Sequence, residues 1–123
     1  AWTDLECGAG SWDAGRSKDY LPSRQATLLR ACAEVYAGGT GEMLRHPYAS
    51  PAHARSFRGL PPLLLQCGAE ERPRDDSVAV AARAAADGVD ARLDVYPGQV
   101  HVFQSFATVL PSAREAVARI GSF

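Results

Sequence analysis

One histidine and several acidic side chains follow two strand-like runs in the second half of this 123-residue chain. His101 lies three residues after the Pro-Gly turn of VYPGQVHVF, and both Glu71 and Asp75 lie in the stretch GAEERPRDD. A carboxylate beside a histidine can hold one ring tautomer and can stabilise the imidazolium that forms when the ring takes a proton. These residue types are suited to supply the base and the orienting acid of a proton-transfer pair.

Each of these residues also has an ordinary structural interpretation. A histidine in a loop is often only solvated or hydrogen-bonded, and acidic residues before a helix commonly cap it and complement its dipole. Asp75 and Asp76 directly precede a helical pattern, so capping explains them best. Glu71 lies outside the cap positions, which makes it the better candidate to face His101.

The pair can form only if the two loops emerge at the same edge of a sheet. Residues 63–68 form a short apolar run that ends in glycine, and 91–98 alternate apolar and polar residues before a Pro-Gly stop. A helical pattern that stops at Gly88 connects them. This order predicts a βαβ unit with parallel strands, whose following loops gather at one edge. The helix residues predicted to face the sheet are Val78, Ala81, Ala82 and Ala85.

A second helical pattern follows the last loop, which makes the order βαβα and the fold class α/β. Pro111 and Ser112 are predicted to open this helix. Its residues predicted to face the sheet are Leu110, Ala113, Ala116, Val117 and Ile120. In the first half of the chain, a helix is predicted from Pro22 and Ser23 to the Gly38–Gly39 stop, between irregular stretches at 6–20 and 40–62.

Composition and charge limit the classes of function. The chain is 46% hydrophobic and 22% charged, as in a globular domain, and its net charge of −1 gives no basic surface for nucleic acid. Its apolar runs are far shorter than the roughly 20 residues that cross a bilayer. Three widely spaced cysteines indicate a reducing, cytoplasmic compartment, with Cys67 as a packing residue. His46 and His53 have no carboxylate at ligand spacing, so no metal site is predicted.

Four stretches resemble the carboxyl-terminal part of the hormone-sensitive-lipase branch of the α/β-hydrolases, especially bacterial carboxylesterases and lipases. They occur in the family's order and together extend over essentially the whole chain. The stretches are WTDLE, HPYASPAHA, LPPLLLQCGAEERPRDDSV and YPGQVHVFQSF. The resemblance implies a serine carboxylesterase that hydrolyses small-molecule esters without a cofactor.

The resemblance also assigns the two candidate residues. In that family the histidine lies in the loop after the eighth strand, which corresponds to His101, and the acid lies in the loop after the seventh strand. The family usually has aspartate followed directly by proline, whereas here Arg72 separates Glu71 from Pro73. Matching backwards from His101 without gaps places the acid at Glu71, 30 positions earlier, with Asp75 as the alternative acid.

By the same resemblance the chain has three parts. Residues 1–7 end a core strand and begin the next loop, 8–57 form a cap-like helical and irregular segment, and 58–123 form the carboxyl-terminal βαβα part of the hydrolase core. Phe106 is predicted to belong to the core. The candidates for substrate contact, each with core packing as its alternative, are Phe103, Val102 and Tyr36.

The third function of a catalytic triad is absent from the sequence. It contains no G-x-S-x-G nucleophile elbow and no His-Gly-Gly oxyanion segment, both of which precede this region in an α/β-hydrolase. We therefore expect an incomplete, inactive fragment that pairs with an amino-terminal half of the hydrolase or self-associates through an exposed sheet edge. The alternative hypothesis is a non-catalytic α/β interaction module derived from such a hydrolase.

Overall fold

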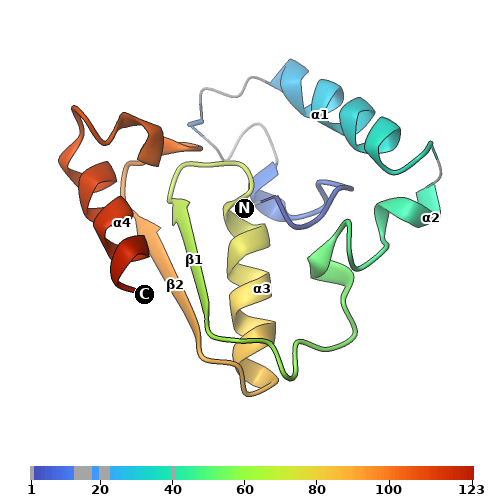
Figure 1. Ribbon diagram of the computed structural model, residues 1–123. Coiled ribbons are helices and arrows are strands. Elements are labelled where there is room, and N and C mark those ends of the chain that lie inside the picture. Colours follow the sequence, from blue (N-terminus) through green and yellow to red (C-terminus); the bar gives the residue numbers. More distant parts are fainter. Residues whose placement is uncertain (1, 13–17, 20–22, 40) are drawn as a thin grey trace.

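Two parallel strands and the helix between them form the centre of the structure (Figure 1). The computed structural model describes residues 2–12, 18–19, 23–39 and 41–123. Strand β1 (Leu63–Gly68) pairs with β2 (Ala91–Tyr96) from Leu63 opposite Ala91 to Gly68 opposite Tyr96, and α3 (Arg74–Ala86) connects them. The predicted βαβ unit is confirmed. The second strand ends at Tyr96, directly before the predicted Pro97–Gly98 stop.

Helix α3 packs on one face of this sheet. A buried cluster joins Val80 and Ala84 of the helix to Phe57 and Val89, with Leu63 and Leu65 of β1 against it. The prediction of the buried helix face was wrong for Val78, Ala82 and Ala85, which are exposed. Alanines occur on all sides of α3, so the apolar pattern of the sequence does not determine which side of the helix faces the sheet. Two polar residues also occupy part of the buried face. The buried residues are Asp76, Ser77, Val80, Ala81 and Ala84.

Helix α4 (Pro111–Ser122) packs on the opposite face, after the short helix η3 (Phe103–Phe106). Alternate β-strand side chains point to opposite faces, and Gln66 donates from Nε2 to the Ala116 carbonyl at 3.0 Å. The predicted burial of Ala113 and Ala116 is confirmed, and Phe103 completes their cluster. Val117 and Ile120 were wrongly predicted to face the sheet, because two strands offer too narrow a surface to cover the outer part of the helix stripe.

The residues before β1 form short helices around a small second core. Helix α1 (Ser23–Tyr36) lies at the upper right of Figure 1 and ends before Gly38 and Gly39, whose positive φ angles of 76° and 80° confirm the predicted stop. The stretches predicted as irregular also contain η1 (Gly10–Trp12), α2 (Gly41–Leu44) and η2 (Pro51–His53). The buried members of this core are Leu5, Ala33, Ala37 and Leu44.

No helix in the described part of the chain is both long enough and apolar enough to cross a membrane.

The end of β1 packs directly against the main chain of the loop after β2, without side chains between them. Backbone hydrogen bonds run from the Ala69 N–H to the Tyr96 carbonyl at 2.9 Å and from the Glu70 N–H to the Gln99 carbonyl at 3.0 Å. A Cβ atom on Gly68 would collide with the Gln99 carbonyl and would lie 2.9 Å from the Val100 carbonyl oxygen. Glycine is therefore required at position 68 for the two loops to meet.

We predict that Gly68→Ala lowers the free energy of unfolding by about 1–3 kcal/mol, because the new methyl group meets main chain that cannot move aside without breaking these hydrogen bonds. Gly121→Ala is the matched control. Gly121 lies in α4, and a methyl group added there would have no neighbouring atom within 4 Å, so this change should be neutral or stabilising by up to about 1 kcal/mol. Chemical denaturation measures both. Equal stabilities for the two variants would contradict the close approach at Gly68.

Candidate active site

The two loops at the carboxyl ends of β1 and β2 bring an acid and a histidine together. Glu71 follows β1 and His101 follows β2, and the parallel register places both strand ends side by side. Nδ1 of His101 lies 3.4 Å from Oε2 of Glu71. The Glu71 side chain is only 4% exposed, whereas the His101 side chain is 31% exposed. A buried acid therefore contacts a ring that solvent still reaches.

The chain conformation beside His101 is strained. Val102 has φ 53° and ψ 29°, a left-handed conformation that is uncommon for a β-branched residue. Such a conformation costs of order 1–3 kcal/mol and persists only where the surrounding contacts impose it. Here the preceding residue is His101, and the following residue, Phe103, is anchored in the core. The strain thus lies at the point where the chain turns from the imidazole into η3.

The other acidic residues near this loop do different jobs. Asp75 forms an ion pair with its neighbour Arg74, whose Nη2 lies 2.9 Å from Oδ1 of Asp75. The prediction that Asp75 or Asp76 is the N-cap of α3 was wrong, because Pro73 occupies that position. Instead, Oγ of Ser11, a residue 64 positions earlier in the sequence, accepts a hydrogen bond from the Asp75 N–H in the first turn of α3 at 3.1 Å. Of the two candidate acids, Glu71 is the one in contact with His101.

Asp76 ties the beginning of the chain to α3. Its carboxylate accepts hydrogen bonds from the Thr3 and Asp4 backbone N–H groups, both at 3.1 Å, and from Nε1 of Trp12 at 3.0 Å. Burial raises the pKa of Asp76 above its ordinary value of 3.8, while these donors act in the opposite direction. Sequence reasoning missed this role because its partners lie 64 to 73 residues away.

We predict that Asp76→Asn lowers the free energy of unfolding by about 2–3 kcal/mol, because the amide cannot accept from all three donors and leaves a buried N–H without its partner. Asp75→Asn, which changes a partly exposed ion pair, should shift it by less than about 1 kcal/mol. Thermal or urea unfolding of the two variants measures the difference. If Asp75→Asn proved the more destabilising change, the role of Asp76 as the tie would be refuted.

The residues predicted to contact substrate are placed differently from one another. Phe103 is 1% exposed and stacks at a tilt on Tyr96 with 4.9 Å between ring centroids, which favours its packing alternative. Val102 and Tyr36 are exposed, Val102 next to the imidazole and Tyr36 at the end of α1. The expectation that Phe106 is core was wrong, since it is 51% exposed. Substrate contact by Phe103, Val102 and Tyr36 remains a prediction.

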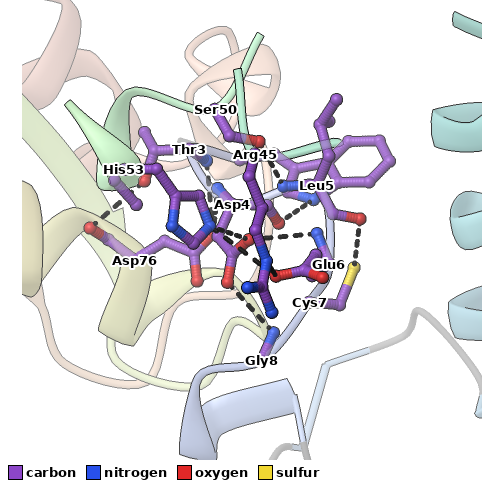
Figure 2. A network of polar contacts seen from close by, with 12 residues as sticks. Thr3, Asp4, Leu5, Glu6, Cys7, Gly8, Arg45, Ser50, His53 and Asp76 are labelled. Atoms are coloured by element: carbon purple, nitrogen blue, oxygen red, sulfur yellow. Dashed lines mark hydrogen bonds and ion pairs between the residues drawn. The ribbon is translucent and has the colours of Figure 1, made fainter. Parts of the chain in front are cut away.

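A second group of histidine and carboxylates lies near the start of the chain, as Figure 2 shows. Nε2 of His53 is 3.1 Å from Oδ1 of Asp4 and 3.8 Å from Oε2 of Glu6, so the fold brings carboxylates to His53 although none stands at ligand spacing along the sequence. The donor atoms of these three residues lie close enough together to hold a metal ion. However, Arg45 lies 2.7 Å from Oε2 of Glu6, and the carboxylate of Asp4 accepts backbone hydrogen bonds from Glu6 and Gly8. The protein's own groups thus already bind oxygen atoms of both carboxylates.

Cys67 behaves as a packing residue rather than as a nucleophile. All three cysteines are free thiols, and Cys67 is fully buried at the end of β1. Burial, followed by the charge of Glu71, raises the pKa of Cys67 to about 11. Because the thiolate is the reactive form, this thiol is unreactive at neutral pH. The interpretation of Cys67 as a small buried hydrophobic residue is confirmed.

Comparison with known proteins adds to this geometry. The sequence pattern of the alpha/beta hydrolase fold matches residues 1–105. An acetyl-hydrolase of Streptomyces hygroscopicus is 38% identical over 122 residues, which are 99% of this chain and 39% of that protein. Esterase LipU of Mycobacterium tuberculosis is 42% identical over 100 residues, covering 80% of this chain and 31% of the relative.

Solved structures give the same relationship. An esterase from the bacterial hormone-sensitive lipase family superimposes with a TM-score of 0.87 at 39% identity, covering 99% of this chain and 39% of that one. The esterase EstE5, from a crystal soaked with p-nitrophenyl butyrate, gives a TM-score of 0.86 at 35% identity with the same two coverages. The chain therefore spans about two fifths of the length of these structures.

Proposed function

This chain belongs to the α/β-hydrolase family, in its hormone-sensitive-lipase branch, and on that premise we propose that it supplies the base and the orienting acid of a carboxylic ester hydrolase. His101 is the base and Glu71 is the acid. The observation that carries the proposal is the contact of 3.4 Å between His101 Nδ1 and the buried Oε2 of Glu71 at the carboxyl edge of the sheet. Relatives named as esterases and as an acetyl-hydrolase support ester hydrolysis as the reaction class.

The proposed mechanism assigns one task to each ring nitrogen. Nδ1 of His101 keeps its hydrogen and directs it at the carboxylate of Glu71. This contact fixes the tautomer and leaves Nε2 as the basic nitrogen. Nε2 takes the proton of a serine hydroxyl as that oxygen attacks the ester carbonyl, and the imidazolium then returns the proton to the leaving alcohol. Water repeats the cycle on the acyl-enzyme and releases the acid. Glu71 stays ionised throughout and stabilises the imidazolium.

The serine and the oxyanion donors in this scheme come from outside these 123 residues, which contain no nucleophile elbow. We propose that an amino-terminal part of the hydrolase supplies them, with residues 58–123 as the carboxyl-terminal part of the core and 8–57 as a cap-like segment. The chain's span of 31–39% of the relatives' lengths supports this division of labour.

We predict that His101→Ala and Glu71→Gln each lower kcat/KM for a short-chain p-nitrophenyl ester by about 10²- to 10⁴-fold in the complete hydrolase that contains this chain. Both variants should still fold, because neither removes a main-chain contact between the loops. Asp75→Asn is the control and should leave kcat/KM within about twofold. Steady-state kinetics measures all three.

A larger effect of Asp75→Asn than of Glu71→Gln would transfer the acid role to Asp75. Labelling with a fluorophosphonate tests the reaction class separately, because this probe reacts with an activated serine. If the complete protein is not labelled and none of the substitutions changes ester turnover, the chain is a non-catalytic interaction module instead.

The exposed sheet predicts how the isolated chain behaves. In the part of the chain that the structure describes, the sheet has only two strands, so each has one edge without a neighbouring strand. Such edges and the exposed apolar residues Val117 and Ile120 favour pairing with further chain. We predict that the isolated 123-residue chain self-associates, and that an amino-terminal hydrolase part added in trans reduces the association. Light scattering with size exclusion measures this; a monodisperse monomer that unfolds cooperatively would contradict it.

A further inference from the structure

One carboxylate outside the two catalytic loops bridges their main chains. Asp19 accepts a hydrogen bond at Oδ2 from the Arg72 backbone N–H at 3.1 Å, and another at Oδ1 from the His101 backbone N–H at 3.4 Å. Arg72 directly follows Glu71 in the sequence. The two oxygen atoms of a single side chain therefore hold the residue next to the proposed acid and the proposed base itself. These partners lie 53 and 82 residues away from Asp19.

The loop after β1 that carries Glu71 (the acid loop) is also held by side-chain and backbone contacts from Ser11 and Trp12. Arg72 is only 4% exposed, and its Nη1 donates to the Trp12 carbonyl at 2.8 Å. The hydroxyl of Ser11 donates to the Arg72 carbonyl and also accepts from the Asp75 N–H. The N–H, the carbonyl and the guanidinium of Arg72 are thus bound by Asp19, Ser11 and Trp12 respectively. This explains the residue that separates Glu71 from Pro73: it anchors the acid loop.

The bridge is needed because the backbone contacts between the loops end before the imidazole. The last backbone hydrogen bond between them joins the Glu70 N–H to the Gln99 carbonyl, two residues before His101. From there the chain must reach the strained left-handed turn at Val102. Hydrogen bonds to an ionised carboxylate are roughly twice as strong as neutral ones, so Asp19 can fix both loops at the positions where they carry Glu71 and His101.

We propose that Asp19 is a positioning residue that sets the distance between the acid and the base of the site. This inference rests on the proposed function, since it assigns Asp19 to the same Glu71–His101 pair. In the described part of the chain, Asp19 holds the two loops through the backbone N–H groups of Arg72 and His101. Its contribution is to hold His101 Nδ1 against Oε2 of Glu71, because a misplacement of about 1 Å in a catalytic group can cost about 10²-fold in rate.

The test is a double-mutant cycle in the complete hydrolase. Asp19→Asn keeps the size of the side chain but replaces one acceptor by an NH₂ group that faces a backbone N–H. We expect kcat to fall about 10- to 100-fold with KM changed less than about threefold. Lys18→Ala, at the exposed neighbouring position, is the matched control and should leave both constants unchanged. Asp19→Glu, which keeps both charged oxygens, should recover part of the lost kcat.

The cycle distinguishes positioning from a general loss of structure. If Asp19 acts through the Glu71–His101 pair, the double variant should have a kcat less than about threefold below that of Glu71→Gln alone. The reason is that aligning His101 with residue 71 no longer helps once the carboxylate is gone. If the two losses multiply in full, or if Asp19→Asn alone retains wild-type kcat while Glu71→Gln does not, the positioning role is refuted. A normal kcat for Glu71→Gln itself would instead refute the proposed function.

Amide hydrogen exchange gives a readout independent of turnover. In Asp19→Asn the Arg72 and His101 amides should exchange at least about tenfold faster, while that of Leu63, which donates to the Asp90 carbonyl at the other end of the strands, keeps its protection. This pattern also separates a local release of the loops from unfolding of the variant. Unchanged exchange at both loop amides would overturn the bridge.

Discussion

The parallel pairing of β1 with β2 is the constraint on which the rest of the structure depends. Because Gly68 lies opposite Tyr96, the two strands end together and their loops leave at one edge. Backbone contacts then continue past the strands, from Ala69 to Tyr96 and from Glu70 to Gln99. Glu71 and His101 follow these contacts on the two loops. A shift of the register by one residue would turn the side chains at the strand ends to the opposite faces and separate the pair.

The amino-terminal stretch is attached to this centre by side chains that bind backbone. Asp76 holds Thr3 and Asp4, and Ser50 Oγ accepts from the Leu5 N–H at 2.9 Å. The same kind of contact links Ser11 and Asp19 to the acid loop. A chain segment without a strand or long helix has backbone groups that need partners, and buried polar side chains provide them here. The segment and the loops after β1 and β2 therefore stabilise each other.

In the described part of the chain, His53 and His101 both contact carboxylates, but the surroundings of the two histidines differ. Asp4 and Glu6 beside His53 are also bound by Arg45 and by backbone N–H groups, in a partly exposed cluster on an irregular part of the chain. Glu71 beside His101 is buried at the carboxyl end of parallel strands, where ligands of α/β folds bind. The same residue types thus form a surface ion-pair network in one place and the proposed acid–base pair in the other.

The sequence by itself determined the βαβα order, the helix stops at Gly38 and Gly39, and the choice of His101 and Glu71 as candidates. These features follow from local periodicity, turn residues and loop position, which nearby residues encode. Only the tertiary structure decided which face of α3 is buried, that Phe103 rather than Phe106 is core, and that Asp76 ties down the chain start instead of capping a helix. It also brought Asp19 to Arg72 and His101. The physical reason is that these outcomes depend on contacts between residues distant in sequence, for which polar side chains leave no periodic signal.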